Sequence, residues 1–518
     1  MWPSLSDVRA GSTEPLRAKW PDHRYRDTVT APVDRRGAPW LAGQLGSWRS
    51  GNDGPGYRAL ADRVRLLVLD GRVPSGTRLP AERDLAGVLA VSRGTVTAAY
   101  DRLEADGYLA RRRGAGSWTT LPTATLTGPS TPFAPTGTAS GALDLTHAAT
   151  AAPLEAVHAA AARAVDALPA HLLGHGYDLL GLTALRERIA ERYTRRGLPT
   201  RPDQVLVTGG AQHALMLALR TLVSPGDRVL VEHPTYPNAL EAVRRGSARP
   251  VPVPLDDDGW DTALLARTLR EASPRLAYLV PDHQNPTGHV MPDTQRAEIA
   301  DVVRRSGTAL VVDETLVDLR LDGPDDPSPT PMAALAPAGR AEDVPVITLG
   351  SASKTLWAGL RIGWLRAPRS VIARVAAARA SVDMATPVLE QLIVADLLPR
   401  HDALLAPRLA TLRAQRDHLL GVLSAALPTW RPSRPSGGLF LWVDLGAPVS
   451  SAFVVAAARH DLTLAAGPVF GIGGAFESHL RLPFVHPTDV VDAAVPRLAA
   501  AWQTLDASAT TTPTASVV

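Results

Sequence analysis

Residues 351–364 read SASKTLWAGLRIGW and contain Lys354, one of only two lysines in a chain of 518 residues. The other lysine is Lys19, so arginine supplies the remaining 52 of the 54 basic side chains. The position of Lys354 in this stretch can be due to chance, because a lysine that occurs in the chain must lie at some position. The alternative is that this position needs an amine that can lose its proton and attack a carbonyl carbon, which a guanidinium cannot do. Lys354 is therefore a candidate catalytic residue.

Short apolar runs alternate with helical stretches on the N-terminal side of this lysine. The runs are apolar on both faces and helices separate them, which is typical of buried strands in a mostly parallel sheet. From about residue 400 the order becomes helix, strand, helix, strand, which indicates a smaller α+β lobe. The predicted strands are QVLVT (204–208), RVLVE (228–232), LAYLV (276–280), ALVVD (309–313) and VITLG (346–350), followed in the small lobe by GLFLWVDL (438–445) and LRLPF (480–484).

Groups suited to a phosphorylated aromatic cofactor follow the ends of these strands, which is the edge where open α/β sheets bind ligands. Gly210 and Ala211 lead into a helix after QVLVT, and the free N–H groups of a helix N-terminus suit a phosphate. Arg361 can add charge and a fork of donors to that phosphate. The other candidates are Tyr236 in HPTYPN, Asn285 in PDHQNPTG, Asp313 at the end of ALVVD, and Ser351 and Ser353 beside the lysine.

Together, a lysine, a phosphate cradle, a lone acid and a stacking aromatic ring make chemical sense for pyridoxal 5′-phosphate (PLP). Lys354 would form the Schiff base, and Asp313 would keep the pyridine nitrogen protonated so that the ring withdraws electrons. Each piece has an ordinary alternative: a capped strand end for Asp313, core filling for Tyr236 and a tight turn for the glycines. Their joint order favours the cofactor site.

Residues 141–507 resemble the class I/II, fold-type I aminotransferases through the motifs HQNPTG, VVDET and SASKTLWAGLRIGW. The resemblance implies an α/β PLP-binding body with a large and a small lobe. It also implies the role of each site residue: phosphate binding by Gly210, Ala211, Ser351 and Arg361, ring stacking by Tyr236, the ring-oxygen contact by Asn285, the ring-nitrogen contact by Asp313 and the Schiff base by Lys354.

Arg481 in LRLPF matches the arginine with which these enzymes grip an amino acid's carboxylate, a bidentate role that suits arginine. The alternative for Arg481 is a surface or core-edge ion pair.

Two positions depart from the family pattern. Leu316 stands where many members have a tyrosine that donates to the ring oxygen, and Tyr177 is displaced from the usual place of a tyrosine that reaches the partner subunit's phosphate.

The stretch LPAERDLAGVLAVSRGTVTAAYDRLEADGYL (79–109) carries a second pattern, two helices joined by a short turn. Ser92 can cap the second helix by accepting a hydrogen bond from its free N–H groups. An apolar stripe then faces inward, which leaves Arg93, Thr95 and Thr97 facing outward near the helix start, as reading of the DNA major groove requires. The following RRRGAGSW (111–118) predicts a basic hairpin tip that can approach a sugar–phosphate backbone.

This order resembles the winged helix-turn-helix domain of GntR-family regulators over about 60 residues. The alternative is a small helical dimerisation module with a basic surface. The resemblance implies double-stranded DNA as a partner, with contacts from Arg83, Ser92, Arg93, Thr95, Thr97, Arg113 and Gly116.

Charge divides the chain in the same way. Residues 1–119 hold 19 Lys and Arg against 13 Asp and Glu, whereas the remainder holds 35 against 38. A basic N-terminal part on a mildly acidic body favours a polyanionic partner for the N-terminal part alone.

The absence of cysteine excludes disulfides, thiolate metal sites and a cysteine nucleophile. Neither a signal-like start nor an apolar run of about 18 residues occurs, so a cytoplasmic protein without a membrane span is expected.

The combination resembles the MocR/GabR family of PLP-dependent transcriptional regulators, which implies a homodimer with PLP, an amine or an amino acid as effector. The first alternative is a working aminotransferase with an accessory DNA-binding domain, and the second is a cofactor-free scaffold. The predicted organisation is an extension (1–54), a winged helix-turn-helix domain (55–120), a flexible linker (121–140), the PLP-binding body (141–507) and a disordered tail (508–518).

Overall fold

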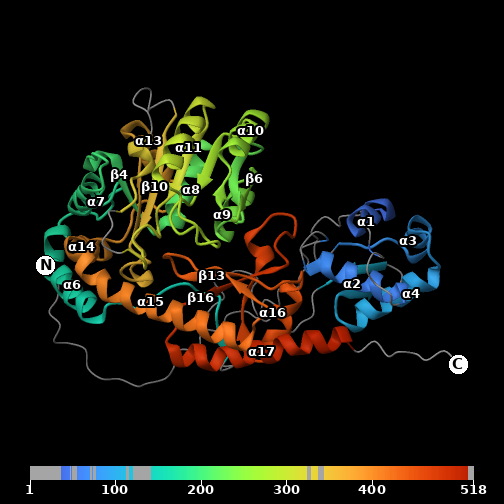
Figure 1. The fold of residues 1–518 in the computed structure, drawn as a ribbon. Coiled ribbons are helices and arrows are strands. Elements are labelled where there is room, and N and C mark those ends of the chain that lie inside the picture. Colours follow the sequence, from blue (N-terminus) through green and yellow to red (C-terminus); the bar gives the residue numbers. More distant parts are fainter. Residues whose placement is uncertain are drawn as a thin grey trace, which may run out of the picture.

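The computed structural model consists of a small helical module, a large α/β lobe and a smaller α+β lobe (Figure 1). The residues that it describes are 37–46, 48, 55–69, 73, 77–112, 116–120, 142–323, 328–335 and 344–510. The predicted linker (121–140) therefore lies wholly outside the described residues, and so do residues 1–36 and 511–518.

The N-terminal module is a winged helix-turn-helix. Ser92 caps its second motif helix as predicted, because its Oγ accepts a hydrogen bond from the Thr95 N–H at 3.1 Å. The predicted inward stripe of that helix is buried in one core with the other helices. The elements are α2 (Gly56–Leu69), α3 (Glu82–Leu89) and α4 (Arg93–Ala105), then the antiparallel hairpin of β1 (Leu109–Arg112) and β2 (Gly116–Thr119).

A further helix, α1 (Ala38–Leu45), belongs to this module although it precedes the predicted domain start at residue 55. Leu41 and Leu45 are fully buried in the module's core. The helix lies within residues 1–54, which were predicted from the sequence to form an extension outside the DNA-binding domain. The apolar residues of one short helix were too few to define a core element without their packing partners.

The large lobe is built on a mixed sheet of eight strands in the order β4-β11-β10-β9-β8-β5-β6-β7. Strands β10, β9, β8, β5 and β6 run parallel, whereas β11 is antiparallel to both of its neighbours and β7 is antiparallel to β6. The strands are β4 (Val205–Thr208), β5 (Arg228–His233), β6 (Arg249–Asp256), β7 (Gly259–Trp260), β8 (Leu276–Leu279), β9 (Ala309–Asp313), β10 (Val346–Ser351) and β11 (Gly363–Arg366).

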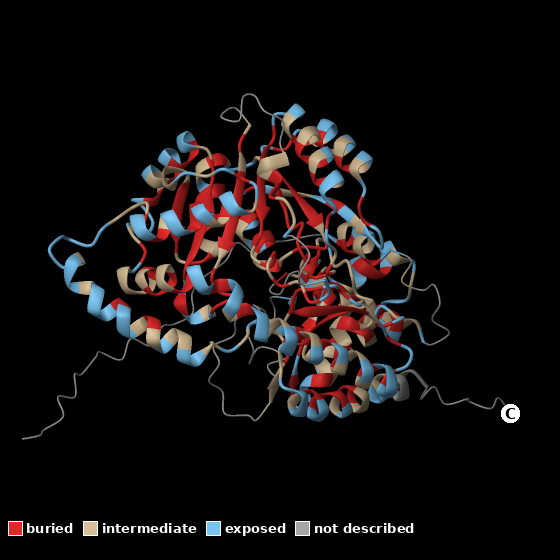
Figure 2. Ribbon diagram, turned by 60° about the vertical axis from the view of Figure 1, so that its left-hand side comes forward, coloured by how far each residue is buried: buried red, intermediate tan, exposed pale blue. Residues whose placement is uncertain are grey.

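Helices cover both faces of this sheet, because its strands are apolar on both sides. Val229 and Val231 pack into one cluster, while Leu230 between them packs into another on the opposite face. The buried strands therefore lie between layers of helices whose outer sides are exposed (Figure 2). One face carries α8 (Ala211–Leu222), α9 (Pro237–Arg245) and α13 (Arg369–Arg379), and the other α7 (Thr183–Arg195), α10 (Thr262–Ala272), α11 (Asp293–Arg305) and α14 (Val388–Leu397), with α6 (Leu154–Ala167) against α14.

The small lobe has an antiparallel sheet in the order β12-β13-β16-β15, covered by helices. A short parallel pair, β3 (Leu143–Asp144) with β14 (Leu462–Thr463), joins the beginning of the body to this lobe. The other elements are β12 (Arg431–Pro432), β13 (Phe440–Asp444), β15 (Ala465–Ala466), β16 (His479–Pro483), α15 (His401–Ala426), α16 (Ser450–Ala458) and α17 (Thr488–Thr510). Within the described ranges, no helix is long and apolar enough to cross a membrane.

Candidate cofactor and DNA-binding sites

One cavity of about 540 Å³ brings together the residues that the sequence proposed for the cofactor. Gly210 is the exception, since it lies next to the wall rather than in it. The remaining residues come from five different strand ends and from the small lobe, so only the folded sheet places them side by side. They are Ala211, Tyr236, Asn285, Asp313, Ser351, Ser353, Lys354, Arg361 and Arg481.

Lys354 lies in the wall of this cavity, and its surroundings favour the neutral form of its amine. Its Nζ donates a hydrogen bond to the Ala148 carbonyl oxygen at 2.7 Å. Burial lowers the pKa of Lys354 from 10.5 to about 8, and the nearby charge of Arg481 acts in the same direction while Asp313 opposes it. A substantial fraction of the amine is therefore neutral, and able to act as a nucleophile, near physiological pH.

This pKa predicts how covalent attachment of PLP depends on pH. Only the neutral amine attacks an aldehyde, so the rate of attachment should rise with pH and level off above about 8, where the pKa of Lys354 lies. Stopped-flow absorbance after adding PLP to the cofactor-free protein measures this rate. A rate that keeps rising toward pH 10.5, the ordinary value for lysine, would contradict the assigned environment.

Asp313 ends β9 as a buried carboxyl aimed into the cavity. It accepts hydrogen bonds from the Tyr278 hydroxyl at 2.7 Å and from the Thr315 N–H at 2.9 Å. Burial raises the pKa of Asp313, whereas those hydrogen bonds and the charge of Lys354 act to lower it. Among the described residues no basic side chain forms an ion pair with Asp313. A protonated pyridine nitrogen is a cation that would compensate this buried carboxylate.

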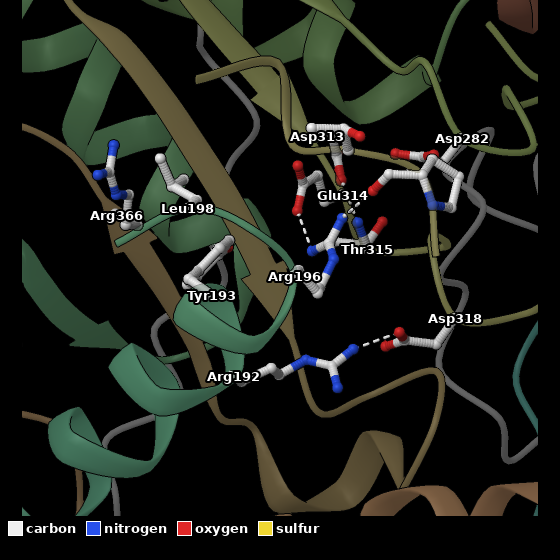
Figure 3. Close-up of polar contacts among 12 residues, drawn as sticks. Arg192, Tyr193, Arg196, Leu198, Asp282, Asp313, Glu314, Thr315, Asp318 and Arg366 are labelled. Atoms are coloured by element: carbon white, nitrogen blue, oxygen red, sulfur yellow. Dashed lines mark hydrogen bonds and ion pairs between the residues drawn. The ribbon is translucent and has the colours of Figure 1, made fainter. Parts of the chain in front are cut away.

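The chain that follows Asp313 is fastened to the C-terminal end of α7 by two ion pairs (Figure 3). Glu314 accepts from Arg196 Nη1 at 2.5 Å, with both side chains buried, and Asp318 pairs with Arg192. Loss of one partner from a buried pair leaves an uncompensated charge, which costs about 3–5 kcal/mol. These pairs therefore fix the backbone that presents Asp313 and Thr315 to the cavity.

A phosphate cradle forms where α8 begins. Gly210 is the N-cap of α8 with φ +100°, and Arg361 Nη2 donates to the Gly209 carbonyl at 2.9 Å. A Cβ on Gly210 would lie 2.7 Å from Arg361 Nη2, and a Cβ on Gly363 would lie 2.4 Å from the Gly210 carbonyl carbon. The glycines thus let a guanidinium lie against the N-terminus of a helix, which is a site for an anion.

The close approach predicts the effect of Gly210→Ala. The new methyl group would displace Arg361, so the Kd for PLP should rise on the order of tenfold or more, as expected for loss of a charge-assisted hydrogen bond of about 1.5–3 kcal/mol. Fluorescence titration with PLP measures the change. Gly226→Ala is the matched control, because Gly226 has φ +90° but open space around its Cβ position. Equal losses of PLP affinity in the two variants would show strain, not the cradle, to be the cause.

Arg481 lies on β16 opposite the lysine, stacked on aromatic rings and only partly satisfied. Its guanidinium is 5.3 Å from the Phe440 ring centroid and 4.9 Å from that of Phe470. It donates to Asn285 Oδ1 at 3.3 Å and to the Thr146 carbonyl, while its buried Nε has no hydrogen-bond partner among the described residues. Burial lowers the pKa of Arg481 to about 10, so it remains a cation at neutral pH.

The surroundings of Arg481 bear on the two roles that the sequence left open. No carboxylate in the described parts of the chain pairs with it, so it forms no core-edge ion pair of the expected kind. A buried donor without a partner calls for an explanation, and a ligand carboxylate supplies one. The arrangement favours the carboxylate-binding role.

Several residues of the cavity were not predicted from the sequence. Tyr278 lies within the predicted strand LAYLV and directs its hydroxyl to Asp313, and Asn238 donates to the Tyr236 hydroxyl at 2.8 Å. Leu316 is buried at the cavity wall where relatives of the body have a tyrosine, and Tyr177 is exposed and not part of the wall. The remaining unpredicted residues include Gln212, Thr146, His147, Ala148 and Phe440.

The DNA-binding candidates lie mainly around the N-terminus of α4. Arg83 and Arg93 are open to solvent, with 87% and 74% of their side chains exposed. Ser92 Oγ and Thr95 Oγ1 lie 2.8 Å apart at the cap. Thr97 is half-buried and donates to Glu82 at 2.7 Å, so its hydroxyl also joins α4 to α3. Arg113 lies outside the described residues.

A groove is lined by the segment that leads into α3, the start of α3, α4 and the wing, and Arg78 is one of its lining residues. The Arg78 guanidinium lies 5.8 Å from the Trp118 ring centroid. A Cβ on Gly116, which has φ +117°, would lie 3.0 Å from Arg78 Nε, so the glycine makes room for this cation next to the turn of the wing. The sequence pattern did not single out Arg78, because its place beside Gly116 depends on the fold of the hairpin.

The N-terminal module has a helix that exposes arginine and hydroxyl groups at its start. The body has a lysine, a buried carboxyl and an anion cradle in one cavity. Together these features define a DNA-binding protein with a PLP-binding domain of the aminotransferase fold. The chain belongs to the aminotransferase class I and II family, whose model matches residues 139–498. Residues 56–118 match the model of the bacterial regulatory proteins of the gntR family. This order of domains is that of MocR-type regulators, and the cofactor of the fold is PLP.

Similar proteins include regulators and aminotransferases. The HTH-type transcriptional regulator YisV of Bacillus subtilis is 27% identical over 486 residues, which span 85% of this chain and 94% of that protein. The probable rhizopine catabolism regulatory protein MocR of Rhizobium meliloti is 33% identical over 61% of this chain and 66% of its own length. The structure of LysN, an α-aminoadipate aminotransferase from Thermus thermophilus complexed with N-(5′-phosphopyridoxyl)-L-leucine, aligns with a TM-score of 0.65 and 30% identity over 71% of this chain and 94% of that chain.

Proposed function

We propose that this protein is a transcriptional regulator whose aminotransferase-like body holds PLP at Lys354 and senses an amine, an amino acid or PLP itself. The observation that carries the proposal is the pairing, in one cavity, of a lysine whose pKa is about 8 with Arg481, whose buried Nε lacks a partner. The same chain carries an exposed groove-reading helix. A cavity built to bind a ligand is thus joined to a module built to bind DNA.

The residues around the cavity have separate tasks in holding the cofactor. When bound, PLP supplies an electrophilic aldehyde and an electron-withdrawing ring. Lys354 would anchor it covalently, and Asp313, held by Tyr278 and Thr315, would keep the ring nitrogen protonated. Ala211 and the Gly210 turn, with Ser351, Ser353 and Arg361, would hold the phosphate group, while Tyr236 would stack on the ring and Asn285 would contact its oxygen.

A ligand that has both an amine and a carboxylate engages both sides of the cavity. Its amine competes with Lys354 for the cofactor, and its carboxylate takes the donors of Arg481. Because Arg481 belongs to the small lobe and Lys354 to the large lobe, such a ligand bridges the two lobes. It shifts the protein toward one arrangement only if it binds the two arrangements with different affinity.

We also propose that the protein acts as a homodimer. Leu172, Leu173 and Tyr177 follow α6 in one exposed stretch, and more than 60% of each residue is accessible to solvent in the single chain. An apolar stretch of this kind is typical of a surface that a second subunit covers. A dimer would also place two winged helices on one DNA molecule, so that the operator would contain paired half-sites.

DNA binding is tested with the DNA upstream of the protein's own gene. Footprinting at low salt should show protection of a specific site, and failure to protect any site there would contradict the regulator. Arg93→Ala should weaken binding by about 1–3 kcal/mol if Arg93 makes a bidentate contact to a base, and by less if it touches phosphate. Arg102→Ala is the control, because Arg102 lies on the same helix at its far end and pairs with Asp106. Equal losses in the two variants would show that α4 does not read bases through Arg93.

Two observations favour a second function, amino-group transfer with repeated turnover. Arg481 has donors available for a substrate carboxylate, and the cavity contains Lys354, Asp313 and Asn285 together. Leu316 argues against it, because it leaves a hydrocarbon where many aminotransferases have a hydroxyl donor. Incubation with amino acids distinguishes the two functions. Repeated formation of keto acid beyond one equivalent of protein would establish the enzyme, whereas at most a single half-reaction is expected of the regulator.

A further inference from the structure

Residues 144–151, which we call the strap, run along the cavity between β3 and α6. Four consecutive strap residues, 146–149, form part of the cavity wall. Two of them accept hydrogen bonds from the cations that define the site: Lys354 Nζ donates to the Ala148 carbonyl at 2.7 Å, and Arg481 Nη2 donates to the Thr146 carbonyl. The strap thus joins the lysine of the large lobe to the arginine of the small lobe.

A single carboxylate fixes the turn that presents these carbonyls. Asp144 accepts from the Thr146 N–H at 2.8 Å, from the Thr146 hydroxyl at 2.6 Å and from His147 Nδ1 at 2.8 Å. Burial acts to raise the pKa of Asp144, but the hydrogen bonds from Thr146 and the charge of His147 outweigh it, so the pKa is lowered. The turn therefore keeps its charged acceptor throughout the neutral range of pH.

The far end of the strap is tied to the segment that carries the lysine. Arg408, on α15, donates to the Ala151 carbonyl and also to the carbonyls of Thr355 and Leu356, at 2.8 and 3.0 Å. Those two residues directly follow Lys354 in the chain. Movement of the lysine segment therefore acts on the strap at two points, directly at Ala148 and, through Arg408, at Ala151.

The strap also occupies a particular place in the chain order. β3, whose last residue is Asp144, is the first strand of the body after residues 121–141, which follow the DNA-binding module. The strand is held by the Leu143 N–H bond to the Asp461 carbonyl and the Leu145 N–H bond to the Thr463 carbonyl, both at 2.9 Å. No other part of the body is as close in sequence to the module.

We propose that the strap transmits occupancy of the cavity to the DNA-binding module. The inference rests on the proposed function, because it takes the cavity to be a sensor. A cofactor attached at Lys354 and a carboxylate bound by Arg481 compete with the Ala148 and Thr146 carbonyls for the same donors. When the site is filled, the strap therefore loses these two hydrogen bonds, and when the site is emptied they form again. β3 passes that change to the chain that leads to the module.

The test uses the full chain with N-(5′-phosphopyridoxyl)-L-leucine, an adduct that carries both the cofactor and a carboxylate. Wild-type protein should change its affinity for the operator by about 5- to 150-fold on binding the adduct, the usual range of allosteric coupling. Asp144→Ala should still bind the adduct, at least as tightly as wild type because the weakened strap competes less for the two donors, but it should lose most of that change in DNA affinity. Asp144→Asn keeps one acceptor oxygen and should restore part of it.

Asp256→Ala is the matched control, because Asp256 accepts the Asp258 N–H at 2.9 Å in an exposed turn remote from the cavity. It should respond to the adduct as wild type does. Hydrogen–deuterium exchange gives a second readout, in which the amides of residues 144–151 should change protection when the adduct binds.

The outcomes separate this inference from the proposed function. If the wild-type protein binds the adduct but its affinity for the operator stays constant, the sensor function itself is wrong. If the wild type responds and Asp144→Ala responds equally, the sensor stands and the strap is not the coupling element. If binding of the adduct left the exchange protection of residues 144–151 unchanged, the proposed role of the strap would also be contradicted.

Discussion

Lys354→Ala is expected to lose all PLP on desalting, together with the visible absorption band of the PLP-loaded protein. Among the described residues that line the cavity, Lys354 has the only primary amine. The phosphate cradle can still hold the cofactor reversibly, so PLP should be recovered in the late, small-molecule fractions and not with the protein. Absorbance before and after a desalting column measures this directly.

Lys354→Arg separates the chemistry of the amine from its charge. It keeps a cation beside Asp313 and in the cavity, but a guanidinium does not attack an aldehyde. We therefore expect the same loss as in the alanine variant. Both variants should still bind operator DNA, because α4 and the wing lie in a separate module, but their DNA affinity should no longer depend on added PLP. A retained visible band in either variant would contradict the assignment of Lys354.

Asp313→Asn is expected to produce the second large effect, on the affinity for the cofactor. In the proposed site the protonated ring nitrogen compensates the buried carboxylate, and breaking a buried ion pair costs about 3–5 kcal/mol, on the order of a hundredfold or more in Kd. The asparagine has the same shape: its Oδ1 can accept from the Thr315 N–H, and its Nδ2 can donate to the Tyr278 hydroxyl, so the fold should be kept. Titration of the cofactor-free protein with PLP measures the loss.

Tyr278→Phe is the comparison that isolates the charge of Asp313. It removes one hydrogen-bond donor to the carboxylate and leaves the carboxylate in place, so PLP affinity should fall by only about 1 kcal/mol. Circular dichroism of both variants checks the fold. If Asp313→Asn bound PLP within a few-fold of wild type, Asp313 would not be the partner of the ring nitrogen.

Local sequence patterns were enough for the elements that frame the site. Each predicted apolar run of the body forms a strand within a residue or two of its expected ends, and Ser92 caps its helix, because these features depend on nearby residues. Strand β6 escaped prediction because it contains three prolines in RPVPVPLD, and proline has no N–H for the ladder. Such a strand is tolerated because only the two-residue β7 lies beyond it at the sheet edge.

Long-range contacts account for what the sequence did not predict. The pairing of Arg196 with Glu314 joins residues 118 positions apart, and the bond from Lys354 to Ala148 spans 206 positions. No periodicity or spacing records such pairs, since each forms only when helices and strand ends meet in the folded body. The motifs located the cofactor site because their residues follow strand ends, whereas the strap follows only the two-residue β3 and has no motif.

The central claim is that one chain binds DNA and PLP and that the second event changes the first. The most direct measurement is the affinity for operator DNA, by gel shift, on samples whose absorbance spectra are recorded before and after adding PLP, with Lys354→Ala beside the wild type. We predict a visible band and a change in DNA affinity that appear together in the wild type and are both absent from the variant. A visible band in the wild type with operator affinity unchanged by PLP would contradict the account.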